Sequence, residues 1–281
     1  CDSILYNLKI QRIIMVKVPS SFDIIGSREK SVAIIEISDE LKGREKEIAQ
    51  DILDTHKNVK SVLQKTSKRE GEYRKRKYKL LAGDKNTEVV HKEYGYRIKV
   101  NPQKVYFSPR EATERQRVAS QVKAGEVVMV MFSGVAPFAI AIAKKQPDVR
   151  RVVAVEMNPE AASYADENIR INKLSHKIVS IPRDVRQACV KWYGKCDRVV
   201  MPLPMGAESF LEIAVNCLKT EGGIIHFYNW GEEPNVFAKA EQLIDEKLKN
   251  MGRKYKIINR HVVSAYSPRR YKVCIDVGVG G

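Results

Sequence analysis

Short apolar runs alternate with amphipathic stretches along the second half of the chain, from residue 111 to residue 250. Apolar runs bounded by turn residues are typical of buried strands, and apolar residues at helical spacing are typical of helices. The expected strands cover 127–132, 151–156, 177–181, 197–201 and 223–229. The expected helices cover 111–121, 137–146, 159–172, 184–192, 207–219 and 234–250. This alternation predicts an α/β domain with a doubly wound, mostly parallel sheet.

The end of the chain departs from this alternation. Residues 256–263 and 271–277 have the pattern of strands, with only seven residues, 264–270, between them. A connection of that length cannot contain a crossover helix, so the two strands are expected to form an antiparallel hairpin. A parallel sheet closed by such a hairpin is the layout of class I S-adenosylmethionine-dependent methyltransferases, a Rossmann-like fold, rather than of dehydrogenases.

The first part of the chain predicts a smaller α/β domain. Residues 40–56 carry Leu41, Ile48, Ile52 and Leu53 at roughly helical spacing, with Ser38 or Asp39 as the expected N-cap. Expected strands lie at 32–37, 73–81, 87–91 and 96–100, and a connector follows at 102–109. We therefore divide the chain into an N-terminal segment (1–30), a small α/β domain (31–101) and a domain with the methyltransferase-like layout (102–281).

Composition excludes several classes of protein. At 281 residues, with 43% hydrophobic and 30% charged residues, the chain has the composition of a globular protein of one or two domains. No apolar run approaches the ~20 residues of a membrane helix, and the N-terminus lacks a signal-peptide layout. Five cysteines without a C-x-x-C pair argue against a disulfide framework and a zinc site. We expect no metal, no membrane association and a cytoplasmic location.

The charge points to a polyanionic partner. Lys and Arg number 50 against 34 acidic residues, a formal net charge of +16. Between Lys65 and Lys79 there are eight basic residues and two acidic ones, with Tyr73 and Tyr78 interleaved. Basic side chains neutralise phosphates and aromatic rings stack on unpaired bases, so this stretch predicts RNA binding. Its candidate phosphate contacts are Lys75, Arg76 and Lys77, with Arg269 in the hairpin connection; the alternative is a solvated charged surface.

Gly134 and Glu156 together predict a nucleoside site. The strand at 127–132 opens into Ser133-Gly134-Val135, and the next expected strand ends at Glu156, 22 residues after Gly134. In a parallel sheet this order places a tight turn beneath the charged end of a nucleoside and a carboxylate on its ribose hydroxyls. Asp184 follows the third strand, where a carboxylate can face an adenine amino group; the alternative is a helix cap, and one carboxylate can serve both roles. A cofactor that contains adenosine is the resulting prediction.

Arg110 and Glu114 form a second candidate site. They lie four residues apart at the start of the helix expected at 111–121, so they can approach each other on one side of it. The alternative is a surface ion pair of little energetic value. His226 lies within an apolar strand, a position more typical of a hydrogen-bonded core histidine than of a ligand.

Several ordered motifs resemble the archaeal and eukaryotic tRNA (guanine-N1)-methyltransferases, which modify position 37, the nucleotide 3′ to the anticodon. The resemblance covers about residues 20–280. The matching segments are 106–110, 112–115, 131–138, Asn158-Pro159, Asn168, 172–174, 222–223, 225–228 and 267–269. Related enzymes of wybutosine synthesis act on the same nucleotide.

This resemblance implies a cofactor, a substrate and a set of site residues. The cofactor is S-adenosyl-L-methionine, the substrate is tRNA, and we expect a monomer. Glu114 corresponds to the proposed general base on guanine N1, Arg110 to a base contact and Arg74 to a residue that supports O6. In the family, the positions of Tyr106, Arg115, Phe132 and Glu156 surround the cofactor. The full set of expected cofactor-binding residues adds Gly134, Met157, Asp184 and Val185.

Three departures from the family pattern leave two alternatives open. Val130 stands where the family usually has Asp, Ala136 where it has a second Gly, and Pro202 where the guanine-N1 enzymes have Asn. Pro202 lacks a side-chain hydrogen-bonding group, which favours a wybutosine-pathway enzyme that methylates the tricyclic intermediate or transfers an aminocarboxypropyl group. Val130 and Ala136 motivate the second alternative, an RNA-binding protein whose cofactor site has decayed. The main prediction is N1 methylation of guanosine 37.

Overall fold

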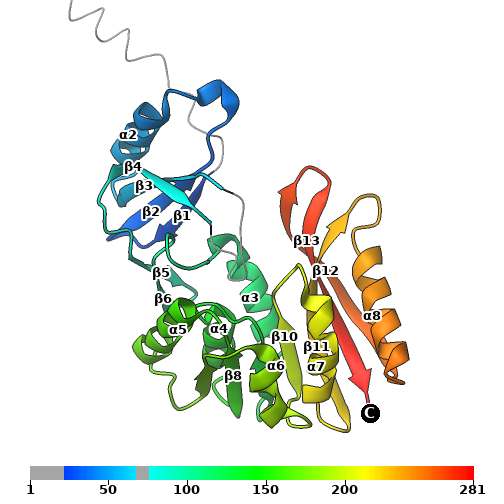
Figure 1. Cartoon of the computed structure of the whole chain (residues 1–281). Helices are drawn as coiled ribbons and strands as arrows, with labels where there is room; N and C mark the ends of the chain where they lie inside the picture. Colours follow the sequence, from blue (N-terminus) through cyan, green and yellow to red (C-terminus); the bar gives the residue numbers. More distant parts are fainter. Residues whose placement is uncertain (1–21, 68–75) are drawn as a thin grey trace, which may run out of the picture. The chain divides into compact units, whose positions relative to one another are not determined.

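The structure, a computed structural model, describes residues 22–67 and 76–281 (Figure 1). The chain folds as two compact units. Within the described residues, the first unit contains 22–92 and Val100–Gln103, and the second contains Glu93–Lys99 and Lys104–Gly281. No helix in these described ranges combines the length and the apolar character needed to cross a membrane.

The first unit contains a four-stranded sheet in the order β1-β2-β3-β4. Only the central β2–β3 pair is parallel. The strands are β1 (Asp23–Gly26), β2 (Ser31–Ile35), β3 (Val59–Lys65) and β4 (Tyr78–Gly83). Helix α2 (Glu45–Thr55) packs Ile48, Ala49 and Ile52 against apolar residues of β2 and β3. A separate two-stranded sheet contains β5 (Val89–Glu93) and β6 (Tyr96–Val100).

The first unit differs from the sequence-based expectation in its helix and in its strands. The helix expected over 40–56 is divided into a 3₁₀ turn, η1 (Asp39–Leu41), and α2, because Gly43 adopts a left-handed φ of +86° between them. Neither Ser38 nor Asp39 therefore caps α2, which begins after Arg44. Strands β1 and β3 were not expected. The strand expected over 73–81 lies partly outside the described residues, and its described part begins at Tyr78.

The second unit contains a seven-stranded sheet in the order β12-β13-β11-β10-β7-β8-β9. The five neighbouring strands β11, β10, β7, β8 and β9 run parallel to one another. Strand β13 is antiparallel to β11, and β12 is antiparallel to β13. The strands are β7 (Val127–Val130), β8 (Arg151–Val155), β9 (Ile178–Ile181), β10 (Arg198–Met201), β11 (Gly222–Glu232), β12 (Tyr255–Ser267) and β13 (Arg270–Gly280). The expected parallel sheet closed by an antiparallel hairpin is confirmed.

The strands of the hairpin are longer than expected, and the connection between them is shorter. β12 ends at Ser267 and β13 begins at Arg270, so the connection is Pro268-Arg269 rather than the seven residues 264–270. Arg269 has a φ of +60°, the left-handed conformation that closes such a short turn. Ser264, Tyr266 and Ser267 interrupt the apolar pattern, so the sequence did not predict that β12 continues through them. β12 is an edge strand whose side chains are partly exposed.

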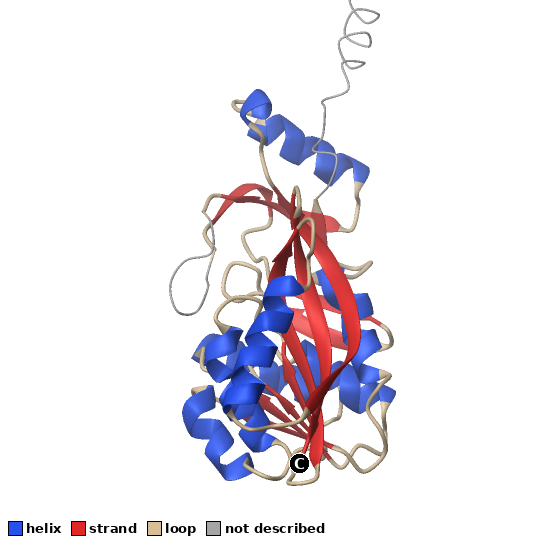
Figure 2. Cartoon of the chain, turned by 90° about the vertical axis from the view of Figure 1, so that its right-hand side faces the viewer, coloured by secondary structure: helices blue, strands red, loops and turns tan. Residues whose placement is uncertain are grey.

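Helices cover both faces of this sheet, as Figure 2 shows. Helices α6, α7 and α8 share one core with the strands, whereas α3, α4 and α5 contact one another. The helices are α3 (Ala112–Ala119), α4 (Pro137–Lys145), α5 (Pro159–Ile171), α6 (Val185–Ala188), α7 (Leu211–Cys217) and α8 (Ala238–Asn250). Short 3₁₀ turns replace parts of the expected helices: η2 (Pro109–Glu111), η3 (Cys189–Trp192) and η4 (Ala207–Phe210).

Candidate active site

The turn that follows β7 has an unusual backbone. Phe132, Gly134 and Ala136 have φ values of +53°, +55° and +65°. Left-handed φ values at non-glycine residues are costly and concentrate at functional sites. Ser133 lies between the first two, and its hydroxyl is one of the few buried side-chain oxygens or nitrogens in the described residues without a hydrogen-bond partner. The turn therefore presents a strained backbone and a free polar group at the carboxyl end of the sheet.

Glu156 is fixed directly against this turn. Its Oε2 accepts a hydrogen bond from the Gly134 amide at 2.8 Å, and its Oε1 accepts one from the Asn158 amide at 2.8 Å. Asn158 in turn caps α5 by accepting from the amide of Glu160 at 3.1 Å. Burial raises the pKa of Glu156, and the backbone donors at residues 158, 134 and 157 oppose that effect. The turn and the carboxylate predicted from the sequence are thus brought together.

These residues fit the adenosine part of S-adenosyl-L-methionine. A carboxylate oxygen has two lone pairs, so each oxygen of Glu156 can still accept a ribose hydroxyl. The Ser133 hydroxyl is an available polar group in the same turn. Ala136 adopts the left-handed conformation without a glycine, and its side chain is fully buried. Val130 is fully buried in β7, a position with no access to a ligand. Neither departure from the family pattern prevents the turn from forming.

Asp184 has the capping role that was the alternative to adenine binding. Its carboxylate accepts from the amide of Arg186 at 2.6 Å at the start of α6, and Val185 beside it is buried. The guanidinium of Arg186 lies 4.2 Å from the ring centroid of Phe210. Phe210 contacts Phe132 edge-on at 4.9 Å, and the sequence did not single it out. Met157, which follows Glu156, is partly exposed.

Replacing Glu156 with alanine is expected to weaken the binding of S-adenosyl-L-methionine by about one to two decades. Charge-assisted hydrogen bonds worth roughly 1.5 to 3 kcal/mol would be lost. Isothermal titration calorimetry measures the dissociation constant, with Asp166→Ala on the exposed side of α5 as the matched control. Because burial raises the pKa of Glu156, affinity in the parent protein should fall as the pH drops through that raised value. An unchanged dissociation constant in Glu156→Ala rejects the ribose assignment.

Arg115 does not have the expected position for a cofactor contact. It is 1% exposed, and its Nε and Nη2 donate to the two oxygens of Glu93 at 2.7 and 2.6 Å. Its Nη1 donates to the carbonyl of Ser108 at 3.1 Å, and the guanidinium lies 5.1 Å from the Phe107 ring centroid. The guanidinium of Arg115 is thus used in contacts with Glu93 and with the segment before η2, which it stabilises. Tyr106 in that segment is 46% exposed and stays a candidate cofactor contact.

Glu114 is turned into the protein rather than toward Arg110. It is 2% exposed, whereas Arg110, in the middle of η2, is exposed. Arg117 donates to its two oxygens at 2.7 and 2.9 Å, and the Tyr228 hydroxyl donates to Oε1. His261 on β12 approaches Oε2 at 3.4 Å. The guanidinium partner of Glu114 is therefore Arg117, one helical turn along α3, because that face of the helix lies against the sheet.

The residues around Glu114 form a polar interface that the sequence analysis missed. Glu111, Glu114, Arg117 and Gln121 recur at helical spacing in and around α3. They face side chains of β11 and β13 that recur at every second residue. The facing side chains are His226, Tyr228, Lys272, Cys274 and Asp276. The sequence signal that could have predicted this interface is the recurrence of polar residues at every second position in two otherwise apolar strands.

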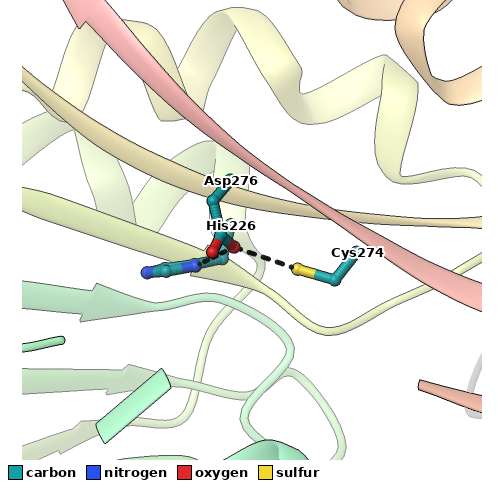
Figure 3. Close-up of side chains that lie close together, drawn as sticks. All are labelled: His226, Cys274 and Asp276. Atoms are coloured by element: carbon teal, nitrogen blue, oxygen red, sulfur yellow. Dashed lines mark hydrogen bonds and ion pairs between the residues drawn. The ribbon is translucent and has the colours of Figure 1, made fainter. Parts of the chain in front are cut away.

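His226 is a hydrogen-bonded core histidine, as expected. It is fully buried; its Nδ1 lies 2.6 Å from Asp276 Oδ1 and its Nε2 lies 2.8 Å from Arg198 Nη1. Figure 3 shows Asp276 between His226 and Cys274, a set with the ligand types of a metal site. Arg117 and Arg198 donate to this same set, so a cation would meet two guanidinium charges there. We therefore interpret the three residues as part of the polar interface.

The candidate RNA contacts are placed unevenly. Arg74 and Lys75 lie outside the described residues. The Arg76 side chain is 16% exposed and 4.0 Å from Glu36, so it is less available for phosphates than expected. Lys77 is exposed. The Arg269 side chain is 85% exposed in the β12–β13 turn, 4.0 Å from Glu233.

Two family models match the chain. The TRM5/TYW2 methyltransferase domain matches residues 89–258, and the TYW2 N-terminal domain matches residues 3–87. The chain belongs to the TRM5/TYW2 methyltransferase family. The family predicted from the sequence motifs is thereby confirmed.

Curated relatives within this family include both branches considered above. The chain is 45% identical to the tRNA (guanine(37)-N(1))-methyltransferase Trm5b of Pyrococcus abyssi, over 93% of this chain and 75% of the relative. It is 36% identical to Trm5b of Methanocaldococcus jannaschii, over 91% and 70% of the two chains. It is 34% identical to the tRNA 4-demethylwyosine(37)-methyltransferase Taw21 of Saccharolobus solfataricus, over 82% and 84%.

Solved structures of similar proteins have the same fold. The complex of aTrm5 and tRNALeu matches with a TM-score of 0.81 and 35% identity, over 98% of this chain and 76% of that one. Methanocaldococcus jannaschii Trm5 in complex with adenosine matches with a TM-score of 0.79 and 34% identity, over 98% and 78%.

Proposed function

We propose that this TRM5/TYW2 family member is an S-adenosyl-L-methionine-dependent tRNA methyltransferase that modifies N1 of guanosine 37. The observation that carries the proposal is the 45% identity to a Trm5b named for this reaction, over nearly the whole chain. The complex of a similar Trm5 with tRNA supports tRNA as the substrate, and a complex with adenosine supports the cofactor. In this chain the turn at Gly134 and the carboxylate of Glu156 provide the corresponding geometry.

Glu114 is the proposed proton acceptor in this reaction. S-adenosyl-L-methionine supplies a methyl group already activated on a sulfonium. Guanine N1 becomes a good nucleophile when its proton leaves: the N1–H bond would break and Glu114 would take the proton. The N1 electron pair would then form the bond to the methyl carbon while the bond between that carbon and the sulfonium sulfur breaks, so that the sulfur leaves as the neutral thioether of S-adenosyl-L-homocysteine. Arg110, together with Arg74, is proposed to stabilise the charge that spreads to O6.

The buried position of Glu114 sets one requirement for this mechanism. The guanine base has to reach a carboxylate that is 2% exposed and held by Arg117 and Tyr228. Side chains at catalytic sites often reach their productive alignment only in the complex with substrate. Of the described partners of Glu114, His261 is the half-exposed one, with 39% of its side chain accessible, so the carboxylate is closest to solvent on the β12 side.

Labelled methyl transfer tests the proposed function. Unmodified tRNA that carries guanosine 37 is incubated with the full chain and methyl-labelled S-adenosyl-L-methionine, and the nucleosides are separated. The expected product is 1-methylguanosine, and a tRNA with adenosine at position 37 is the control that should stay unlabelled. Absence of label in both RNAs rejects the proposal, and absence of cofactor binding in dialysis would favour the decayed RNA-binding alternative.

A second candidate function is methylation of 4-demethylwyosine at the same nucleotide. Pro202, which follows β10 where guanine-N1 enzymes have Asn, and the 34% identity to Taw21 favour it. Pro202 is partly exposed and has no side-chain donor or acceptor for a base. The same assay with tRNA that carries 4-demethylwyosine separates the two functions. A product that gains one methyl group only on that RNA supports the wybutosine enzyme.

Neutralising Lys75, Arg76 and Lys77 together is expected to flatten the salt dependence of tRNA affinity by up to about two to three units of slope. Each phosphate contact releases counterions, so its loss reduces the slope while cofactor binding stays unchanged. Because Arg76 lies beside Glu36, Lys75→Gln with Lys77→Gln should account for most of the change. Filter binding at several salt concentrations measures the slope, with Lys247→Gln and Lys249→Gln on α8 as controls. A slope equal to that of the parent protein identifies this stretch as a solvated surface.

We also propose that the protein acts in the cytoplasm, as a monomer and without a metal ion. Four cysteines, Cys189, Cys196, Cys217 and Cys274, are buried thiols, which fits a reducing compartment. Sedimentation at assay concentration tests the monomer, and methyl transfer that survives dialysis against a chelator supports the absence of a required metal.

A further inference from the structure

One partly buried arginine, with 17% of its side chain exposed, is shared by the proposed base and a second carboxylate. Arg117 donates to both oxygens of Glu114, at 2.7 and 2.9 Å. It also donates to both oxygens of Asp276, at 2.5 and 3.1 Å. Glu114 and Asp276 are 2% and 1% exposed, so neither charge is solvated by bulk water. The proposed reaction needs Glu114 but gives no role to the second carboxylate.

His226 fixes Asp276 without adding charge (Figure 3). Arg198 Nη1 lies 2.8 Å from His226 Nε2, and because a guanidinium only donates, Nε2 has to be the acceptor. Nδ1 then carries the hydrogen that is donated to Asp276 Oδ1 at 2.6 Å. Burial lowers the pKa of His226, against the opposite effect of Asp276, which agrees with a neutral imidazole. Burial alone would raise the pKa of Asp276, but His226 and Arg117 hold it well below its usual range.

The charged groups around Glu114 leave one net negative charge. Lys272 pairs with Glu111 at 2.9 Å, and Arg198 pairs with Glu126 at 2.9 Å. With Glu114, Asp276 and Arg117, the polar interface and the neighbouring Arg198–Glu126 pair together contain four carboxylates and three cations. Burial raises the pKa values of Tyr228 and Cys274, which therefore stay neutral, and Gln121 donates to Asp276 at 3.0 Å. His261 from β12 is the other titratable side chain in the described residues that reaches Glu114.

We propose that Asp276 is a positioning residue for methyl transfer, which preserves the basicity of Glu114 by sharing Arg117. With Asp276 ionised, a proton on Glu114 brings the interface from one negative charge to neutrality. Without that charge, the same proton would leave an uncompensated positive charge in a buried site, which desolvation opposes. An arginine that contacts one carboxylate alone also favours the ionised form of that carboxylate more strongly than an arginine shared by two. The inference rests on the proposed function, because it takes Glu114 as the acceptor of the N1 proton.

The pH dependence of single-turnover methyl transfer tests this proposal with two variants of opposite sign. Asp276→Asn should lower the plateau rate about tenfold and move the midpoint of the acidic limb to lower pH by about one unit or more, because Glu114 becomes a weaker base. Arg117→Gln removes the cation and should move the midpoint to higher pH. Affinities for tRNA and cofactor should stay within about twofold of the parent values in Asp276→Asn. A purely structural role would reduce the rate equally at every pH, without moving the midpoint.

Three controls isolate the effect. All profiles are repeated in a His261→Gln background, which removes the other titratable side chain that reaches Glu114. Asp148→Asn removes one exposed negative charge from a loop of the same unit and should leave the midpoint unchanged. Thermal unfolding at each pH confirms that the variants are folded. If one of the two variants does not fold, the midpoint of the acidic limb in the other still tests the proposal.

Midpoints that coincide with the parent value in the folded variants overturn the role of Asp276. That result is distinguishable from failure of the proposed function. If Glu114→Gln still slows the reaction strongly while these midpoints do not move, Glu114 is the base and only the inference about Asp276 is wrong. If Glu114→Gln has no effect, the assignment of the base fails first.

Discussion

Glu114→Gln is expected to lower the single-turnover rate of methyl transfer by about 10²- to 10⁴-fold. Glutamine has nearly the same size as glutamate and keeps an oxygen that can accept the Tyr228 hydroxyl, but it cannot take a proton from guanine N1. The affinities for tRNA and for S-adenosyl-L-methionine should change little. Glu114 is buried, and its hydrogen bonds do not involve the Gly134 turn, whose partner is Glu156. Rapid-quench measurements with enzyme in excess give the rate of the chemical step directly.

The pH dependence distinguishes loss of the base from general damage. If N1 deprotonation limits the rate, hydroxide at higher pH should partly restore methyl transfer in Glu114→Gln. Glu221→Gln, which neutralises an exposed carboxylate in the same unit, is the matched control and should behave as the parent protein does. Near-parental rates for Glu114→Gln between pH 6 and 9 would remove Glu114 as the base and leave its contact with Arg117 as a structural ion pair.

The proximity of the Gly134 turn and Glu156 was predictable because the two are close in sequence. Gly134 and Glu156 follow the ends of the adjacent parallel strands β7 and β8, so the positions of the two strand ends place the carboxylate beneath the turn. Asn158 follows within two residues and fixes Glu156 through its own amide. Strand ends in an alternating α/β chain are visible as changes from apolar to polar residues, and the sheet order follows from the fold class.

The surroundings of Glu114 were not predictable in the same way. Its partners Arg117 and Tyr228 lie three and 114 residues away, and Asp276 is a further 48 residues beyond Tyr228. Spacing alone suggested Arg110 as the partner, because it ignores which face of α3 meets the sheet. The choice between Arg110 and Arg117 depends on the antiparallel register of β11 and β13, which pairs His226 with Asp276 and Tyr228 with Cys274. Local sequence does not determine that register.

Glu93→Gln is expected to lower the free energy of unfolding of the second unit by about 3–5 kcal/mol. The Glu93 and Arg115 side chains are 5% and 2% exposed, and two guanidinium nitrogens donate to the carboxylate at 2.7 and 2.6 Å. Removing the negative charge leaves a guanidinium buried without a counter-ion. The Tyr96 hydroxyl, which donates to the same carboxylate at 2.5 Å, also loses a charged acceptor. Both tryptophans of the chain, Trp192 and Trp230, lie in this unit, so tryptophan fluorescence during urea unfolding reports on it selectively.

Two further variants distinguish the cost of an unpaired buried charge from the cost of losing one ion-pair contact. Glu212→Gln breaks the more exposed pair with Lys247, 2.9 Å apart, and should cost no more than about 1 kcal/mol. The double variant Glu93→Leu with Arg115→Met removes both buried charges, so it should be much closer to the parent stability than Glu93→Gln alone. A double variant as unstable as Glu93→Gln would instead show that the segment before η2 depends on the Arg115 hydrogen bond to Ser108. Arg115 would then stabilise the unit through that bond rather than through its charge.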